Sequence, residues 1–207
     1  MFNRKVHWES IHDGKSPLDV SWYQKEPSSS LELIRNTQVS DGEPIIDVGG
    51  GTSLLVDFLI EEGHSNIAVL DISQKALAYT QKRLGDLAQS VEWFETDITG
   101  FEAPHHFSLW HDRAVFHFLA IESDRRRYLE VLENSLCPGG HLVIATFSIG
   151  GAVKCSGLPV IQYDAKKLAE ELGEDYRLLE ERKEVHLTPA SKEQEFTYFR
   201  FIREPRR

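Results

Sequence analysis

Apolar residues along the chain alternate between short continuous runs and longer segments in which they recur every three or four positions. Continuous runs of this length are typical of buried strands, and the wider spacing is typical of helices that pack on one face. Predicted strands lie at 45–48, 67–71, 91–95, 107–111 and 141–147, with predicted helices at 52–62, at 73–87 and from Asp124 to the break at Cys137-Pro138-Gly139-Gly140. This alternation predicts a doubly wound α/β fold with a mainly parallel sheet.

The C-terminal part departs from the alternation. A glycine-containing loop at 148–162 precedes a predicted helix at 165–172, and two long strand-like runs follow at 178–187 and 195–202. Because a polar turn joins these two runs, we expect them to form an antiparallel hairpin at the edge of the sheet. The hairpin brings the predicted sheet to seven strands.

The first forty residues are polar and aromatic and contain several turn signals. They include one predicted helix, through Leu31, Leu33 and Ile34, for which Ser28 or Ser29 is the expected N-cap. The sequence contains no internal repeat and no linker. We therefore expect one domain over 1–207, made of an N-terminal cover (1–40), a core (45–147) and a C-terminal part with a substrate loop, a helix and the last strands (148–207).

The stretch Ile45-Ile46-Asp47-Val48-Gly49-Gly50-Gly51-Thr52 joins a predicted strand to a predicted helix. Glycines at such a junction let the backbone turn sharply and let a ligand approach where a Cβ would clash. The next predicted strand ends in Asp71, where a carboxylate can accept both hydroxyls of a ribose. A strand, a glycine loop, a helix, a second strand and an acid in this order indicate a nucleoside-binding site.

The loop residues narrow the choice of nucleoside. A dinucleotide site favours G-x-G-x-x-G, whose third position here is Leu54, and the chain has no G-x-x-x-x-G-K-[ST] loop for phosphates. The loop begins instead with Asp47, which would repel a phosphate and suit an ammonium group. A ligand with a ribose, a cationic amino-acid tail and no phosphate matches S-adenosylmethionine.

On these residues, the stretch of about 45–147 resembles the class I S-adenosylmethionine-dependent methyltransferases. The resemblance implies a Rossmann-like fold and an enzyme that uses S-adenosylmethionine as its cofactor. It also implies that the acid and glycine loop cradles the methionine part of the cofactor, while Asp71 holds the ribose.

Ligands of such sheets bind beyond the carboxyl ends of the parallel strands. Asp97 is expected there to accept a hydrogen bond from the adenine amino group, and Ile98 to cover a face of the ring; the alternative for Asp97 is a turn or helix-cap residue. The predicted cofactor-binding residues are Trp8, Asp47, Gly49, Gly51, Asp71, Ile72, Asp97, Ile98, His111 and Arg113.

The segment Trp110–Leu119 combines acidic, basic and aromatic residues after the fourth predicted strand. Methyl transfer to an amine needs a general base, for which His117, His111 and Asp112 are the candidates, whereas a thiolate acceptor needs little beyond position. The ordinary pKa of a histidine lies near neutrality, which suits His117 to this role. The alternative is that His117 packs between Phe116 and Phe118.

The predicted substrate-binding residues are Trp22, Tyr23, His117, Cys155 and Tyr163. Trp8, Trp22 and Tyr23 form either an aromatic lid, since aromatic faces attract a sulfonium, or a packed N-terminal cover. Cys155 is either a reactive thiol or an ordinary loop cysteine.

Three shorter stretches resemble the thiopurine and thiol methyltransferases more loosely: Trp8 through Gly14-Lys15, Trp110-His111-Asp112-Arg113-Ala114 and Ser156-Gly157-Leu158-Pro159. The second carries one inserted residue, His12 stands where that branch has a second tryptophan, and Leu158 replaces a proline. Residues 112–117 also resemble the Asp-Lys-Gly-Thr-x-Asp loop of small protein-lysine methyltransferases, with Arg113 for the lysine and His117 for the last acid.

These resemblances lead us to expect methyl transfer to a small molecule, at a thiol, another soft nucleophile or an amine. One alternative is a protein-lysine methyltransferase, and another is a module that binds S-adenosylmethionine without catalysis.

Composition restricts the partners. The formal net charge of −10 and the absence of a broad basic footprint argue against a nucleic-acid partner. No apolar run approaches the roughly 20 residues that span a membrane, and neither a signal peptide nor a cysteine framework is visible. We expect a cytoplasmic protein with no metal and no membrane or nucleic-acid partner, either a monomer or a weak dimer.

Overall fold

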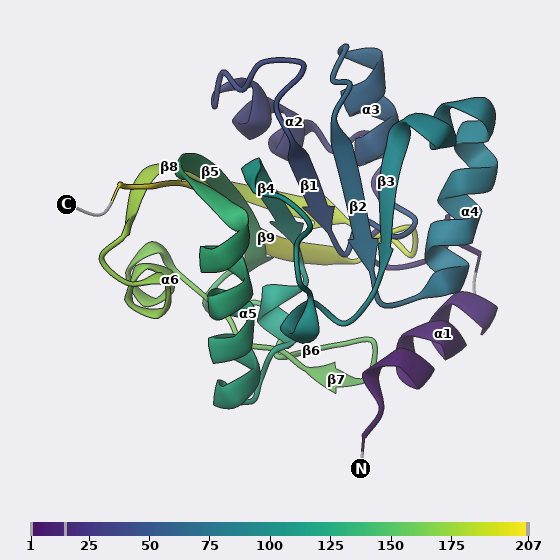
Figure 1. Ribbon diagram of the computed structural model, residues 1–207. Helices are drawn as coiled ribbons and strands as arrows, with labels where there is room; N and C mark the ends of the chain where they lie inside the picture. The colour runs from purple at the N-terminus through teal and green to yellow at the C-terminus, as the bar shows by residue number, and fades with distance from the viewer. Residues whose placement is uncertain (1, 15, 206–207) are drawn as a thin grey trace.

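The computed structural model describes residues 2–14 and 16–205, and the predicted motif residue Lys15 lies outside them. A seven-stranded sheet has the order β3-β2-β1-β4-β5-β9-β8 (Figure 1). Its strands are β1 (Ile45–Val48), β2 (Ile67–Asp71), β3 (Val91–Glu95), β4 (Phe107–Arg113), β5 (Leu136–Phe147), β8 (Tyr176–Leu187) and β9 (Glu193–Arg203). The first five strands are parallel, while β9 runs antiparallel to β5 and β8. The predicted doubly wound sheet and its antiparallel edge hairpin are confirmed.

Helices cover both faces of this sheet. One buried cluster joins α2, α3 and α4 to one face, and a second joins α5 and α6 to the other. The helices are α1 (Arg4–Gly14), α2 (Ser28–Arg35), α3 (Leu55–Glu61), α4 (Gln74–Leu84), α5 (Glu122–Ser135) and α6 (Ala165–Leu172), with short 3-10 turns η1 (Gly85–Ser90), η2 (Ile98–Gly100) and η3 (Phe116–Phe118). None of the helices within 2–14 and 16–205 is long and apolar enough to cross a membrane.

Several predicted boundaries are wrong for local reasons. α3 begins at Leu55, three residues late, because the amide of Ser53 turns back to the carbonyl of Gly50 at 2.6 Å. α4 ends at Leu84 because Gly85 takes a φ of +58°, which a continuing helix does not allow. The predicted serine cap of α2 is also wrong, since the helix already includes Ser28 and its N-cap residue is Pro27.

α1 was not predicted from the sequence. None of its residues is buried, so its sequence has no apolar stripe to reveal it. Polar contacts hold α1 in place: Glu9 accepts a hydrogen bond from the Gln74 amide at 2.7 Å, and Asp13 pairs with Lys75 at 2.5 Å.

The predicted loop at 148–162 contains a small hairpin, β6 (Lys154–Cys155) and β7 (Leu158–Pro159). Figure 1 shows this hairpin and α1 beyond the arrowheads of the central parallel strands. Segments from both ends of the chain therefore flank the carboxyl edge of the sheet.

Candidate functional site

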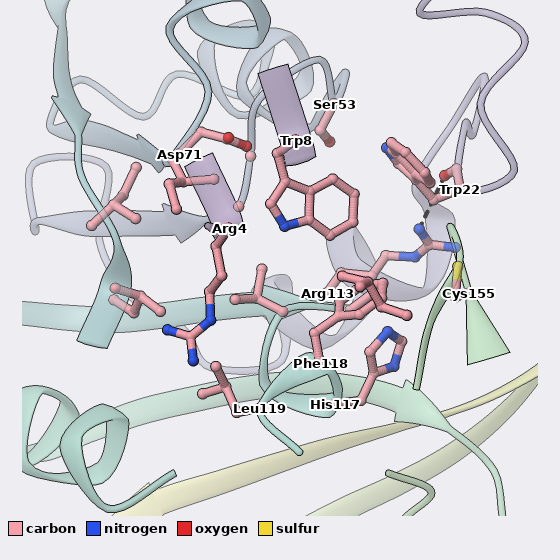
Figure 2. A pocket seen from close by; sticks show the side chains of 18 of the residues that line it. Arg4, Trp8, Trp22, Ser53, Asp71, Arg113, His117, Phe118, Leu119 and Cys155 are labelled. Atoms are coloured by element: carbon pink, nitrogen blue, oxygen red, sulfur yellow. Dashed lines mark hydrogen bonds between the residues drawn. The ribbon is translucent and has the colours of Figure 1, made fainter. Parts of the chain in front are cut away.

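A cavity of about 360 Å³ opens at the carboxyl edge of the parallel strands. Its wall includes most of the predicted site residues, namely Trp8, Trp22, Tyr23, Asp47, Gly49, Asp71, Ile72, Asp97, Ile98, His111, Arg113, His117 and Cys155. Figure 2 labels six of them: Trp8, Trp22, Asp71, Arg113, His117 and Cys155. Three predicted residues, Gly51, Asp112 and Tyr163, are absent from this wall.

Asp47 is hydrogen-bonded to the ring of His111. The Nδ1 of His111 lies 2.6 Å from Oδ1 of Asp47, and its Nε2 lies 2.9 Å from the hydroxyl of Ser30. Both ring nitrogens of His111 are therefore engaged, which leaves no lone pair for a general base. Oδ2 of Asp47 is buried without a hydrogen-bond partner in the described residues. A buried carboxylate oxygen of this kind suits a cationic ligand group.

Asp71 lies at the end of β2, where its Oδ1 accepts the amide of Ser73 at 2.8 Å. Burial, assisted by the nearby charges of Asp47 and Glu9, raises the pKa of Asp71 to about 7. Within the described ranges no lysine or arginine nitrogen lies within 4.0 Å of this carboxylate. A bound cation or hydroxyl donor would therefore favour its ionised form.

The two predicted loop glycines are required for different reasons. Gly49 has a φ of +70°, and a Cβ there would lie 2.1 Å from Cγ2 of Val115. Gly51 has a φ of +25°, and a Cβ there would lie 2.4 Å from Oδ2 of Asp71. Gly51 thus makes room for Asp71 and does not itself face the cavity.

Asp97 has both oxygens occupied. Its Oδ1 caps η2 by accepting the amide and hydroxyl of Thr99 at 2.9 and 2.8 Å, while its Oδ2 lies 3.0 Å from Nη1 of Arg4. These hydrogen bonds and the Arg4 charge outweigh burial and hold the pKa of Asp97 below its usual value. Arg4 also pairs with Asp124, so α1 is joined to two walls of the cavity.

Asp112 supports the chain instead of facing the cavity. It is fully buried, accepts the amides of Val115 and Phe116 at 2.8 and 3.1 Å, and accepts the Tyr128 hydroxyl at 2.6 Å. Burial raises the pKa of Asp112 to about 6. The structure therefore contradicts a direct catalytic role, because this carboxylate shapes the turn that carries Arg113 and η3.

His117 is fully buried, yet its ring forms part of the cavity wall. The ring stacks on Phe147 with a centroid distance of 4.7 Å, and its Nδ1 accepts the Phe147 amide at 3.3 Å. Burial, assisted by the Arg113 charge, lowers the pKa of His117 to about 3. The neutral ring therefore carries its proton on Nε2, which has no partner in the described residues. This corrects the predicted general base, since no ring lone pair faces the cavity.

Arg113 holds two segments together. Its Nε donates to the Tyr198 hydroxyl at 2.8 Å and its Nη1 to the carbonyl of Trp22 at 3.1 Å. The guanidinium lies 4.6 Å from the ring centre of Phe196. Nη2 is buried without a partner among residues 2–14 and 16–205.

Aromatic rings divide the cavity. Trp8 meets Trp22 and Phe118 edge-on at 5.8 and 5.0 Å. In Figure 2, Trp8 lies between Asp71 and Arg4 on one side and Arg113, His117 and Cys155 on the other. The lid and packed-cover alternatives for these rings both remain compatible with this arrangement.

Two predicted substrate residues differ in position. Cys155 lies in the wall, with its sulfur 3.9 Å from the Ser21 hydroxyl. Tyr163 is fully buried against Phe116 at 5.4 Å, with the ammonium of Lys167 4.8 Å from its ring centre. Tyr163 thus supports η3 from outside the cavity wall.

Sequence reasoning missed several wall residues. Phe147 ends β5, so the strand-end rule was sufficient to predict it. Arg4, Ser30, Phe118, Asp124 and Phe196 are also part of the wall. Apart from the aromatic run around Phe118, the sequence carried no local signal for them, because tertiary packing brings them to the site.

Residues 46–142 match the family model described as a methyltransferase domain. The chain carries a methyltransferase domain. The fold of the chain is also the one found in solved structures of S-adenosylmethionine-dependent methyltransferases. A search of the curated proteins gives no match.

Similar solved structures share the fold of this methyltransferase at low sequence identity. One comes from work on the conversion of a disulfide bond into a thioacetal group during echinomycin biosynthesis, with a TM-score of 0.79, 15% identity and coverage of 98% of this chain and 92% of that chain. An S-adenosylmethionine-dependent methyltransferase of Anabaena variabilis has a TM-score of 0.76 and 14% identity, with coverage of 99% of this chain and 96% of that chain. The 1,6-didemethyltoxoflavin-N1-methyltransferase of Burkholderia thailandensis has a TM-score of 0.71 and 15% identity, with coverage of 97% of this chain and 88% of that chain. Its structure holds 1,6-didemethyltoxoflavin and S-adenosylhomocysteine.

Proposed function

We propose that this methyltransferase binds S-adenosylmethionine at the ends of β1, β2 and β3 and transfers its methyl group to a small organic acceptor. The cofactor end of the cavity is the wall formed by Asp47, Asp71, Ile72, Asp97 and Ile98. Asp47 would face the ammonium group through its unpartnered Oδ2, and Asp71 would accept the ribose hydroxyls. Ile72 and Ile98 supply apolar surface for the adenine.

Asp97 can still accept a hydrogen bond from the adenine amino group. A carboxylate offers about four lone-pair positions, and Thr99 uses Oδ1 twice while Arg4 uses Oδ2 once. We propose that Asp97 fixes η2, anchors α1 and accepts from adenine on Oδ2 beside Arg4.

The acceptor end of the cavity is the wall formed by Trp22, Arg113, His117, Phe147 and Phe196, with Cys155 beside it. It is mostly aromatic, and its polar groups are few and fixed in place, as in sites for small molecules. Trp8 and Trp22 from the N-terminal part and Cys155 from the β6–β7 hairpin all line the cavity. This lining by two segments outside the sheet is the observation that carries the small-molecule proposal.

The sulfonium of the cofactor supplies an activated methyl group, so the protein's contribution is to align two molecules and to exclude water. The three predicted bases are engaged elsewhere: His111 with Asp47 and Ser30, Asp112 with backbone amides, and His117 with Phe147. We therefore propose that the acceptor arrives with its nucleophilic lone pair available, as a thiolate, another soft nucleophile or a neutral amine.

A protein-lysine substrate remains the second candidate, because residues 112–117 resemble the loop of that class. A cell lysate incubated with the enzyme and radiolabelled S-adenosylmethionine separates the two. We expect label in the low-mass fraction, whereas label in a protein band would replace the small-molecule proposal. Cofactor binding without label in either fraction would favour the non-catalytic module.

A further inference from the structure

Two buried nitrogen donors at the acceptor end have no partner in the described residues. They are Nη2 of Arg113 and Nε2 of His117, and both side chains belong to the cavity wall. Figure 2 shows both on the side of Trp22 and Cys155, away from Asp71. Buried N–H groups without an acceptor are rare and unfavourable, most of all when the donor is charged.

The two donors share one aromatic support. The Arg113 guanidinium lies 4.6 Å from the centre of the Phe196 ring, and the His117 ring lies 6.3 Å from the same ring. His117 is fixed by its stack on Phe147 and by the amide bound to its Nδ1. Arg113 is fixed by Tyr198 and by the carbonyl of Trp22. Each donor is therefore held in place before any ligand binds.

The electrostatics at this point favour an anion. No carboxylate in the described part of the chain lies within 4.0 Å of the Arg113 guanidinium. Most of the other described arginines do pair with a carboxylate. Burial and the Arg113 charge keep the pKa of His117 near 3, so the histidine contributes a neutral N–H and the arginine the positive charge.

We propose that Arg113 and His117 form an oxyanion subsite that binds a carboxylate, or a comparable anionic oxygen, on a flat aromatic methyl acceptor. The inference rests on the proposed function, because it names the acceptor class of the same cavity. The oxyanion accepts from Nη2 and Nε2 and leaves the acceptor's nucleophilic atom free to face the methyl group. The rings of Trp22, Phe147 and Phe196 suit an aromatic body.

Ligand-observed NMR titrations with benzoate and with its neutral isostere benzamide test the subsite. They are run on the full chain with and without S-adenosylhomocysteine, whose own binding is measured separately by calorimetry. We expect wild type to bind benzoate about tenfold more tightly than benzamide, as for a charge-assisted pair of hydrogen bonds.

Two variants locate the effect. In His117→Asn, the amide oxygen can take the place of Nδ1 and keep the Phe147 amide paired, while the donor at Nε2 is lost. Arg113→Gln removes the charge, and its folding is checked by thermal unfolding because Arg113 also binds Tyr198. Arg126→Gln is the control, since Arg126 pairs with Glu122 on the surface. We expect the benzoate preference to fall severalfold in both site variants and to be unchanged in the control.

Each outcome separates the two proposals. Equal affinity for benzoate and benzamide in wild type, or an unchanged preference in both site variants, overturns the subsite. Absent binding of S-adenosylhomocysteine with an intact benzoate preference overturns the proposed function and leaves the anion subsite standing.

Discussion

The two ends of the cavity differ in the charges that the described residues leave unpaired. At the cofactor end, Asp71 and one oxygen of Asp47 have no basic partner in the described ranges. At the acceptor end, Arg113 has no acidic partner among these residues. The cavity thus has opposite unpaired charges at its two ends. A cationic donor and an anionic acceptor would each satisfy the end they approach, and exchanging them would place like charges together. We infer that electrostatics sets the order of the two molecules along the cavity as much as shape does.

The charge at the cofactor end is tested most strongly by Asp71→Ala. We expect S-adenosylhomocysteine to bind roughly 10- to 150-fold more weakly by calorimetry, corresponding to about 1.5–3 kcal/mol for hydrogen bonds to a charged group. The exposed Asp86→Ala is the matched control. Unchanged affinity in Asp71→Ala would mean that the cofactor does not use this carboxylate.

The same carboxylate predicts a pH dependence at the cofactor end alone. Because the pKa of Asp71 is raised to about 7, binding that requires its ionised form should be about tenfold weaker at pH 6 than at pH 8. Calorimetry at both values measures this, and Asp71→Asn should abolish the difference.

The raised pKa of Asp71 also affects stability. The folded protein holds a proton that the unfolded chain releases near pH 4, so this group's stabilising contribution is present at low pH and is lost as the pH rises through about 7. We expect Asp71→Asn to unfold at a higher temperature than wild type at pH 8 and without cofactor. A lower unfolding temperature would contradict this account of the buried charge.

The anchoring of α1 at the cofactor end is tested by Arg4→Ala. The pair between Arg4 and Asp97 at 3.0 Å is partly exposed, with 27% of the Arg4 side chain accessible, so we expect cofactor affinity to fall only about two- to fivefold. Hydrogen exchange in α1 should slow when S-adenosylhomocysteine is added to wild type, and slow less in Arg4→Ala. Exchange that does not respond to the cofactor would favour a fixed cover over a lid.

The smallest effect is expected at Ala114, in the turn that leads from Arg113 to η3. Its φ of +72° lies in the left-handed region, which costs a residue with a Cβ about 1 kcal/mol. Ala114→Gly should therefore change the free energy of unfolding by less than about 1 kcal/mol, because relief of this strain is offset by greater freedom of the unfolded chain. Urea denaturation measures the change. A loss well above this value would mean that the Ala114 methyl group has a packing role that its backbone conformation does not reveal.

The sequence by itself determined the sheet and the residues that lie at the carboxyl ends of β1 and β2. Asp47, Gly49, Gly51 and Asp71 are close in the chain, and their positions after two buried strands follow from apolar runs that local rules can interpret. The antiparallel edge of β8 and β9 was predicted separately, from two long strand-like runs joined by a polar turn. Parallel strands bring their carboxyl ends together in every sheet of this kind, so no long-range information was needed.

At the acceptor end the sequence named Trp22, His117 and Cys155, but only the tertiary structure brought them together with Arg113, Phe147 and Phe196. The residues of the acceptor end come from the N-terminal part, β4, β5, the β6–β7 hairpin and β9. These segments lie far apart in the sequence. No residue of α1 is fully buried, so α1 left no apolar pattern in the sequence, although it brings Arg4 and Trp8 to the cavity. Histidine is a common general base, which suggested that role for His117. Whether a ring lone pair is available depends on which ring nitrogen accepts the hydrogen bond from the Phe147 amide. Hydrogen-bond partners of this kind are chosen by packing between distant segments, and a single residue's chemistry does not encode them.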